Sequence, residues 1–318
     1  MRPAGERAWV TGLALLLDLA LGDPPNRLHP VAWMGQAIAA AQRRAQGSGR
    51  SPLAYLLMGA GIALGGGAAV AVLARAAEWL AARLPRPWGW LLQALLLKST
   101  FSLRGLMGAA RAVHEPLAAG DLPTARRLLG WHLVSRDTRA LDAGQVAAAT
   151  IESLAENCSD GVLAPLFYYG LGGLPAAMAY RFVNTGDAML GYRDPAREWL
   201  GKAPARLDDL ANLVPARLTA GLLVLAAWLA GENPRRAWRV WRRDHGCTAS
   251  PNAGHPMAAM AGALGVALAK EGHYVLGEGQ PTPTPAEIPR AVKMVWLASL
   301  LGVGLLVAGL KIKRLKIG

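Results

Sequence analysis

The chain has 318 residues, of which 53% are hydrophobic and only 17% are charged, and its mean hydropathy is +0.24. Ordinary soluble domains carry about 25% charged residues, so this composition favours a protein embedded in lipid. The net charge of +13 would suggest nucleic-acid binding in a soluble protein, but the sequence has no zinc-ligand spacing and no aromatic RNA-binding motif. Its basic residues lie in short clusters between apolar runs, as in the cytoplasmic loops of membrane proteins. We therefore expect an all-α, polytopic integral membrane protein with the lipid bilayer, and no nucleic acid, as a partner.

The first apolar runs differ in how well they fit a membrane span, which needs about 20 residues. Residues 9–21 form a short, marginal run, whereas residues 53–74 are long, apolar and rich in glycine, and make the plainest span. Residues 88–97 are strongly apolar, and we expect this helix to continue past Lys98 as a partly buried amphipathic helix.

The later runs include a segment that does not read as a simple span. Residues 162–180 contain two prolines and three glycines, which predicts a broken or re-entrant helix. Residues 213–230 and 292–310 are good spans, while residues 256–269 are too short to cross. Between the spans we expect amphipathic helical loops, one of them starting at Asp121 as N-cap. The predicted architecture is a single membrane-embedded helical domain over residues 1–318, located in the cell (inner or plasma) membrane.

The sequence allows two membrane topologies, which differ in the side on which the basic segments lie. Basic clusters at residues 75–86, at residues 235–243 and from Lys311 onward predict three cytoplasmic segments. The Arg-rich stretch 181–209 should then lie across the membrane from residues 235–243. Either one apolar segment is re-entrant or one of these basic segments lies outside the cell; we expect the active site to face the cytoplasm.

The most informative stretch is LDAGQVAAATIESLAENCSDG, residues 141–161. At about 100° per residue, a helix would place its acidic and amide side chains within an arc of roughly 80°. Like charges four residues apart destabilise an isolated helix, so a metal ion or basic side chains from elsewhere should neutralise this stripe. The plain alternative is a helix face in solvent, but the neighbouring sequence is strongly apolar. The stripe consists of Asp142, Gln145, Ala149, Glu152, Glu156 and Asp160.

Further polar motifs interrupt the apolar background. Residues 22–30, GDPPNRLHP, use prolines to hold Asp23 and His29 in a turn, for which capping alone is the simpler explanation. The mixture of Lys, Arg, Ser and Thr at residues 98–104 and 135–139 suits phosphate or carboxylate. Residues 180–187, 206–212 and 250–256 add carboxylate and amide groups. Oxygen ligands in this number are those that bind Mg²⁺ together with substrate phosphates.

Taken together, these motifs resemble the adenosylcobinamide-phosphate synthase family of vitamin B12 biosynthesis. The similarity runs in order from about Asp18 to about Gly265 and is carried by GDPPNRLHPVAWMG, SRDT, ESLAENCSDGVLAPLFYYGLGG, AYRFVNTGDAMLGYRD, ARLDDLANLVPARLT and SPNAGHPMAAMAGALGV. The chain departs from the family where it has His255 (often Trp), Met257 (often Glu), Cys158 (often Thr) and Ser135 (often Gly). A role for an acid at Met257 therefore does not carry over.

The resemblance implies ATP- and Mg²⁺-dependent formation of an amide between the propionate of adenosylcobyric acid and an aminopropanol, usually as its phosphate. The expected route converts the propionate to an acyl phosphate, which the amine attacks. Other cobalamin-pathway enzymes are further expected partners. The sequence does not distinguish free from phosphorylated aminopropanol.

Side-chain chemistry assigns roles within this reaction. Glu152, Glu156 and Asp160 are the predicted catalytic residues, and the predicted metal ligands are Glu156, Asp160, Asp187 and Asp208. Guanidinium groups should neutralise phosphate and amides should orient substrate. The predicted substrate-binding residues are Asp23, His29, Arg136, Asn157, Arg181, Asn184, Arg193 and Asn252. The main alternative is a membrane transporter or binding protein for a corrinoid or another anion; a third is a scaffold for soluble pathway enzymes.

Overall fold

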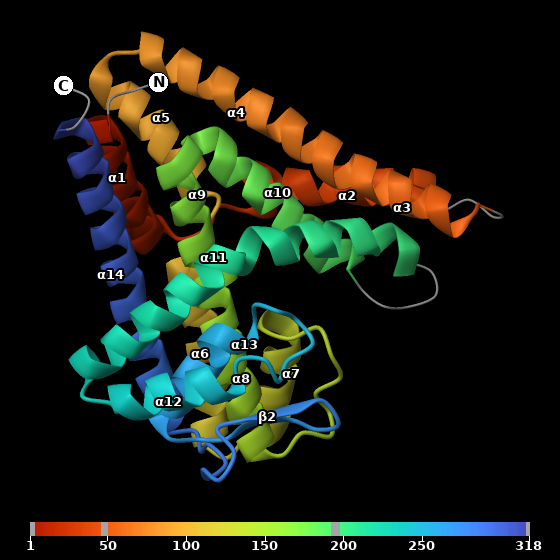
Figure 1. The fold of residues 1–318 in the computed structure, drawn as a ribbon, viewed down its shortest axis with the longest axis vertical. Helices are drawn as coiled ribbons and strands as arrows, with labels where there is room; N and C mark the ends of the chain where they lie inside the picture. Colours follow the sequence, from red (N-terminus) through yellow and green to blue (C-terminus); the bar gives the residue numbers. More distant parts are fainter. Residues whose placement is uncertain (1–3, 46–49, 192–197, 316–318) are drawn as a thin grey trace. The chain divides into compact units, whose positions relative to one another are not determined.

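The computed structural model describes residues 4–45, 50–191 and 198–315, which are almost entirely helical (Figure 1). The predicted all-α architecture is confirmed, with a small two-stranded hairpin as an addition. The helices are α1 (Ala4–Leu21), α2 (Pro30–Ala45), α3 (Pro52–Ala60), α4 (Gly66–Arg83), α5 (Arg86–Lys98), α6 (Leu103–Ala118), α7 (Leu122–His132), α8 (Ala143–Asn157), α9 (Ala164–Gly172), α10 (Leu174–Leu190), α11 (Glu198–Ala230), α12 (Pro234–Asp244), α13 (Gly254–Leu264) and α14 (Glu287–Leu315).

Short segments of other geometry join some of these helices. A 3₁₀ turn, Asn26–Leu28, precedes α2, and a π-helical segment, Gly61–Gly65, joins α3 to α4. A second π-helical segment, Cys158–Leu163, joins α8 to α9. Strands β1 (Leu268–Lys270) and β2 (Tyr274–Leu276) pair antiparallel, with Leu268 opposite Leu276.

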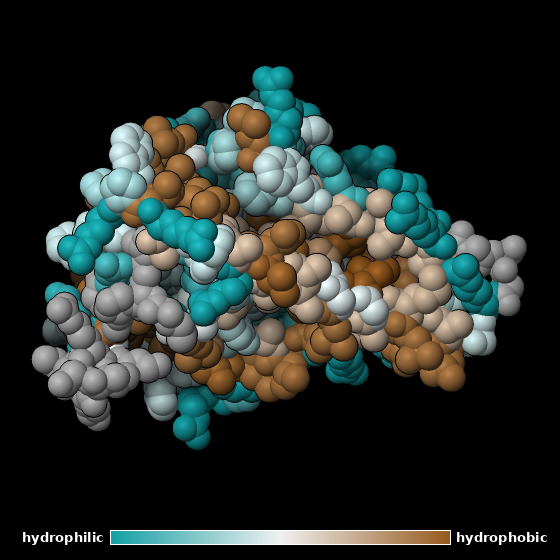
Figure 2. Space-filling model, turned by 90° about the horizontal axis from the view of Figure 1, so that it is seen from above, coloured by the Kyte–Doolittle hydropathy of each residue, from teal (hydrophilic) through white to brown (hydrophobic). Residues whose placement is uncertain are grey.

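Three of the described helical segments are long and apolar enough to cross a membrane: Pro52–Arg83, Glu198–Ala230 and Glu287–Ile312. They contain the predicted spans at residues 53–74, 213–230 and 292–310. Large apolar side chains on these segments stay exposed, among them Leu73, Trp228 and Leu305. Apolar side chains also reach the surface elsewhere, between polar ones (Figure 2). Because lipid makes such exposure favourable, the chain is an all-α membrane protein.

The chain divides into two compact units, each built from separate stretches of sequence. Unit 1 comprises Met1–Ser102, Ala164–Asn212 and Leu305–Gly318, and unit 2 comprises Leu103–Leu163 and Leu213–Gly304. The single domain expected from the sequence stays a prediction.

In unit 1, α10 packs against α4, α9 and α2, and α1 packs against α5. The close approach of α4 to α10 depends on Gly66, because a Cβ atom at this position would collide with the ring of Phe182. The helix predicted at residues 162–180 is broken, as expected. Gly173, at φ +73°, ends α9, and its conformation is one that L side chains rarely adopt.

The break between α9 and α10 is capped from a neighbouring helix of unit 1. The first backbone N–H of α10, at Leu174, donates to Oε1 of Glu78 on α4 at 2.9 Å. The other carboxylate oxygen of Glu78 accepts from Arg75 at 3.0 Å. A carboxylate at a helix N-terminus accepts from a backbone N–H that would otherwise be unpaired. Its negative charge is also attracted to the positive end of the helix dipole.

The prediction that the helix at residues 88–97 continues past Lys98 is wrong. Helix α5 ends at Lys98 and α6 begins at Leu103. The hydroxyls of Ser99 and Thr100 donate to the carbonyls of Leu96 and Leu97, each at 2.7 Å. Such local side-chain hydrogen bonds compete with the helix and end it.

In unit 2 the core is built around α13, in which every residue is buried. It packs against α12 and α8, and the hairpin packs against α8 and α13. Residues 256–269 therefore form a short buried helix and the first hairpin strand rather than a span. Asp121 caps α7 as predicted, since its side chain accepts from the N–H of Thr124 at 3.1 Å.

Candidate functional site

The predicted acidic stripe is only partly present on α8. Asp142 and Gln145 form a capping box at the N-terminus of the helix: each side chain accepts from the other's backbone N–H at 2.8 Å. Asp142 is therefore a cap outside the helix and not part of the stripe, whereas Gln145 lies within α8. Glu152 and Glu156 remain one turn apart on α8, whereas Asp160 lies beyond it, half-buried in the π-helical segment. A π turn contains more residues than an α turn, so the spacing that aligned Asp160 with Glu156 does not apply there.

Glu152 is the best-defined candidate in unit 2. Its residue is 6% exposed, and its Oε1 atom is buried without a hydrogen-bond partner. The Arg136 guanidinium, from the loop between α7 and α8, lies 3.8 Å from Oε2. Burial raises the pKa of Glu152 to about 7, against the opposing effects of Arg136 and of a hydrogen bond with Tyr274. A carboxyl group with this pKa can accept or release a proton near neutral pH.

The hairpin supplies residues to this position that the sequence did not single out. Tyr274 on β2 interacts with Glu152, and Lys270 on β1 is close enough to lower the pKa of that carboxyl group. The hairpin is placed against α8 by tertiary packing alone, and no local pattern in residues 268–276 indicates this contact. The Glu152 cluster is defined here as Arg136, Glu152, Glu156, Lys270 and Tyr274.

Two predicted amide residues of unit 2 form hydrogen bonds outside the Glu152 cluster. Asn157 donates from Nδ2 to the Ser153 carbonyl one turn earlier, at 2.9 Å. Asn252 is buried, and its Oδ1 accepts from Arg217 of α11 at 3.4 Å. No described contact joins either of them directly to Glu152. Arg217 is a second polar residue that the sequence analysis did not select.

Unit 1 contains a chain of hydrogen bonds between α10 and α11. Arg181 donates to Asn184 Oδ1 at 3.0 Å, and Asn184 donates to Asp208 Oδ1 at 3.2 Å. The second oxygen of Asp208 accepts from Asn212 at 3.0 Å, and Asn212 in turn accepts from the hydroxyl of Tyr180 at 2.9 Å. Three predicted site residues, Arg181, Asn184 and Asp208, are thus brought together.

Asp187 lies one turn beyond Asn184 on α10. Burial raises the pKa of Asp187 to about 7, and the nearby carboxylates of Asp208 and Asp209 add to the rise. The α10–α11 cluster, defined as Arg181, Asn184, Asp187, Asp208 and Asn212, combines carboxylates with one guanidinium. Arg193, also predicted to bind phosphate, lies outside the described residues.

The predicted turn at residues 22–30 forms a separate cluster in unit 1. Asp23 accepts hydrogen bonds from Lys98 and, at 2.5 Å, from Ser102, and lies 3.6 Å from Nε2 of His29. Burial opposes ionisation of Asp23, but these three donors outweigh it and hold the pKa of its carboxyl group well below the usual value. His29 Nδ1 accepts from the backbone of Val31 at 3.2 Å. These contacts favour a positioning role for Asp23 and His29.

The Mg²⁺ expected from the sequence needs oxygen ligands from the side chains of these clusters. Within the described ranges, no group of three or more His, Cys, Asp or Glu residues is placed to hold a metal ion by itself. Mg²⁺ bound with a nucleotide needs one or two protein carboxylates, because phosphate oxygens and waters complete its shell. Asp187 and Asp208, beside Arg181, fit this requirement.

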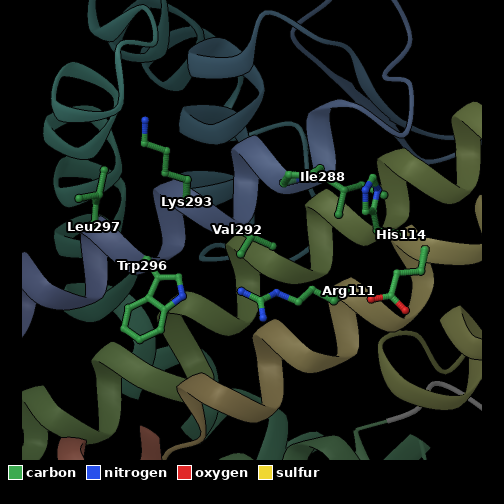
Figure 3. Close-up of a pocket in the computed structure, with 9 residues that line it drawn as sticks. Arg111, His114, Ile288, Val292, Lys293, Trp296 and Leu297 are labelled. Carbon is green, nitrogen blue, oxygen red and sulfur yellow. The ribbon is translucent and has the colours of Figure 1, made fainter. Parts of the chain in front are cut away.

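A pocket in unit 2 lies apart from these clusters (Figure 3). It has a volume of about 570 Å³ between α6 and α14, and none of the predicted site residues lines it. Its wall is mainly apolar and includes Val292, Trp296 and Leu297, with Arg111 projecting toward them from the facing helix. Its one carboxylate is Glu115, so it lacks the paired acids that the expected chemistry requires.

The fold and the clusters define a helical membrane protein with buried acid–guanidinium clusters in both units. Comparison with known proteins identifies the family to which this chain belongs. Residues 11–295 match the model of the family described as CobD/Cbib protein. The chain therefore belongs to the CobD/CbiB family, whose role is in cobalamin biosynthesis.

Several relatives match over nearly the whole chain. The cobalamin biosynthesis protein CobD of Citrobacter koseri is 39% identical over 314 residues, which cover 95% of this chain and 96% of the relative. That of Klebsiella pneumoniae is 40% identical, covering 94% and 96%. The probable cobalamin biosynthesis protein CobD of Methanothermobacter thermautotrophicus is 43% identical, covering 91% and 93%. No solved structure matches the chain.

Proposed function

We propose that this protein is an ATP- and Mg²⁺-dependent amide ligase that joins aminopropanol phosphate to the propionate of adenosylcobyric acid and so makes adenosylcobinamide phosphate. Membership of a cobalamin-biosynthesis family supports the pathway. The observation that carries the chemistry is Glu152: a buried carboxyl group with a pKa of about 7, one oxygen without a hydrogen-bond partner, and a guanidinium 3.8 Å from the other.

Amide formation needs an activated carboxyl group and a neutral amine. ATP supplies the activation by converting a propionate oxygen into a phosphate leaving group. An alkylammonium ion must then lose protons as its nitrogen bonds to carbon. Glu152 accepts a proton from the amine, because its pKa makes the carboxylate available near neutral pH.

The neighbouring cation gives the Glu152 cluster a second function. Arg136 keeps part of the Glu152 population ionised and offers N–H groups to the phosphate of the amine substrate. Tyr274 restricts the orientation of the carboxyl group through its hydrogen bond. The cluster thus combines a proton acceptor with an anion-binding group.

The α10–α11 cluster is assigned to Mg²⁺ and nucleotide phosphate. Asp187 and Asp208 would hold the metal, and Arg181 would neutralise phosphate oxygens. Asn184 donates to Asp208 and so holds that carboxylate in one orientation. The assignment rests on the composition of this cluster and on its burial.

The proposal is tested by incubating purified protein with adenosylcobyric acid, aminopropanol phosphate, ATP and Mg²⁺, followed by mass spectrometry of the corrinoid. A product whose mass corresponds to amide formation, with ADP and phosphate released in equal amounts, is expected. Glu152→Gln should lower the rate by about 100-fold or more, since general base catalysis contributes this much. Glu271→Gln, an exposed glutamate in the hairpin turn, is the matched control and should keep wild-type activity.

Unchanged corrinoid and no ATP consumption by well-folded protein would refute the ligase. Saturable corrinoid binding in that same sample would instead favour the transporter or binding protein.

A further inference from the structure

Helix α12 (PRRAWRVWRRD) has two faces of different character. Ala237, Val240 and Asp244 are buried, and the close contact with α13 is made at Gly262, where a Cβ atom would collide with Ala237 and Val240. Arg236 also belongs to this inner side, because it donates to the carbonyls of Gly262 at 2.6 Å and Ala263 at 3.1 Å. These contacts fix the rotation of α12 about its own axis.

The outer face of α12 is a stripe of arginines beside a tryptophan. Arg235, Arg239 and Arg242 are exposed and, at about 100° per residue, fall within an arc of about 60°. Trp238 lies beside them, 47% exposed, with the Arg242 guanidinium 5.8 Å from its ring centroid. Among the described residues, none of the three arginines has an acidic partner within ion-pair distance. The arginine stripe is defined as Arg235, Trp238, Arg239 and Arg242.

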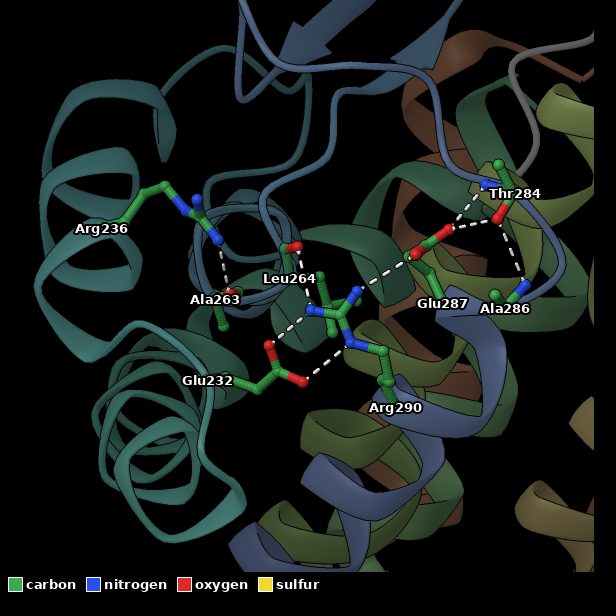
Figure 4. A network of polar contacts seen from close by, with 8 residues as sticks. All are labelled: Glu232, Arg236, Ala263, Leu264, Thr284, Ala286, Glu287 and Arg290. Atoms are coloured by element: carbon green, nitrogen blue, oxygen red, sulfur yellow. Dashed lines mark hydrogen bonds and ion pairs between the residues drawn. The ribbon is translucent and has the colours of Figure 1, made fainter.

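Hydrogen bonds of Arg290 join the start of α14 to Glu232, which follows the end of α11 and precedes α12 (Figure 4). Arg290, in the first turn of α14, forms two hydrogen bonds with Glu232, at 2.9 and 2.6 Å, just after the end of α11. One turn further along α14, Lys293 donates to the carbonyl of Ala230, the last residue of α11, at 3.0 Å. These contacts mark the polar boundary of both spans.

The link from α11 to α12 is too short to carry α12 away from this boundary. Gly231, at φ +80°, ends α11, and Asn233 caps α12 by accepting from the N–H of Arg236 at 2.9 Å. Trp228, in the last turn of α11, is 66% exposed, as expected of a tryptophan at the edge of a bilayer. Where α11 crosses the bilayer, α12 therefore starts at the depth of the lipid headgroups.

We propose that the arginine stripe of α12 binds the phosphate groups of anionic phospholipids and holds unit 2 against the bilayer surface. Guanidinium groups suit phosphate through paired N–H donors, and a tryptophan places its ring at headgroup depth. Unpaired exposed cations on one face, directly after a span, match the negative potential of an anionic membrane surface. This inference does not depend on the reaction that the protein catalyses.

The first test measures phospholipid retained by the full-length protein in detergent, by native mass spectrometry after addition of phosphatidylglycerol or phosphatidylcholine. Wild type should retain phosphatidylglycerol preferentially. The variant Arg235→Gln/Arg239→Gln/Arg242→Gln should lose this preference, with affinity falling about fivefold for each charge removed. The charge-matched control Arg43→Gln/Arg44→Gln/Arg127→Gln changes exposed arginines elsewhere and should retain the preference.

A second measurement does not require the stripe arginines to be replaced. A nitroxide is attached at Trp238→Cys in a Cys247→Ser background, in nanodiscs containing phosphatidylglycerol. The label should be shielded from a water-soluble nickel relaxant and accessible to oxygen, whereas a label at Trp131→Cys, on the exposed side of α7, should be accessible to nickel. Equal nickel accessibility at the two positions, or unchanged lipid preference in the folded triple variant, would overturn the proposal.

Discussion

Arg136 and Glu152 form an ion pair at 3.8 Å in which the carboxyl group is far more deeply buried than the guanidinium. Because burial raises the pKa of Glu152 to about 7 and Arg136 lowers it, we expect amide formation to increase with pH through about 7, as the carboxylate becomes available. Arg136→Gln should move this limb of the pH–rate profile to higher pH. The measurement is kcat/KM for the amine substrate against pH.

The matched control for this pH shift is Arg139→Gln. Arg139 lies in the same loop, but its side chain is 90% exposed and pairs with Asp137. In Arg139→Gln, the rise of kcat/KM with pH should therefore occur at the same pH as in wild type. A limb that does not move in Arg136→Gln would exclude Glu152 as the titrating group.

The hydrogen bond from Asn184 to Asp208 leads to a prediction about Mg²⁺. If Asp208 holds the metal, Asn184→Ala removes one of the two amide donors that orient its carboxylate, and the Mg²⁺ concentration for half-maximal activity should rise by about tenfold. Glu198→Gln is the control, since that carboxylate on the same helix lies 3.5 Å from Lys202 and is not assigned to the metal. An unchanged Mg²⁺ requirement in Asn184→Ala would remove Asp208 from the metal site.

Lys98 is buried between two carboxylates, hydrogen-bonded to Asp23 and 3.8 Å from Asp18. Lys98→Met leaves these acids without their cation and should lower the free energy of unfolding by about 3 kcal/mol or more. Lys202→Met removes a half-exposed partner of Glu198 and should cost less than about 1 kcal/mol. Thermal midpoints in detergent give the comparison, and equal midpoints would contradict it.

His255 is a structural residue of unit 2. Its Nδ1 accepts from Trp241 Nε1 at 2.9 Å, and its ring stacks on His245 with centroids 4.5 Å apart. Burial, with Arg217 and His245 nearby, lowers the pKa of His255 to about 4. The unfolded chain therefore binds the proton more readily, and stability should fall as the pH decreases from about 6.5 to about 4.

Replacing His255 with tryptophan should remove this part of the pH dependence. The measurement is the difference in thermal midpoint between pH 7 and pH 5, for wild type and His255→Trp. His132→Gln, at the exposed end of α7, should behave as wild type. An identical pH dependence in wild type and His255→Trp would show that His255 does not contribute to it.

The junction of α11 with α14 makes the alternatives for the membrane topology testable. Because the end of α11 and the start of α14 lie together, a crossing by α14 carries Lys311 to the side opposite Arg239. One of these basic segments then lies outside the cell. Arg239→Cys and Lys311→Cys, each in a Cys247→Ser background, should react with an impermeant maleimide from opposite sides of sealed membrane vesicles. Labelling from the same side would make α14 re-entrant.

Local rules predicted those parts of the fold that depend on neighbouring residues in the sequence. The span at residues 53–74, the Asp121 cap and the break near Gly173 follow from hydropathy, capping chemistry and glycine conformation. The capping box of Asp142 and Gln145 was equally readable from its spacing and was missed. The end of α5 was missed because Ser99 and Thr100 bond to their own backbone.

The candidate site was harder to predict because its partners come from tertiary packing. The sequence selected Glu152 and Arg136, but Tyr274 and Lys270 reach them from a hairpin far along the chain. Asn212 lies one turn after Asp208 on α11, as the spacing indicates, but Tyr180 and Asn184 reach these two residues from α10 only through tertiary packing in unit 1. The π-helical turn after Asn157 altered a spacing that assumed regular α geometry.

The carboxylate of Glu78 at the start of α10 has a consequence for how unit 1 tolerates lipid. An acid on an apolar helix and an interrupted helix are each unfavourable in a hydrocarbon environment when they stand alone. Placed together, the acid supplies the acceptor that the interruption lacks, and the interruption supplies the donor that the acid needs. Arg75 supplies the cation for the same carboxylate, so the chain changes direction between α9 and α10 with both the N–H of Leu174 and the charge of Glu78 paired.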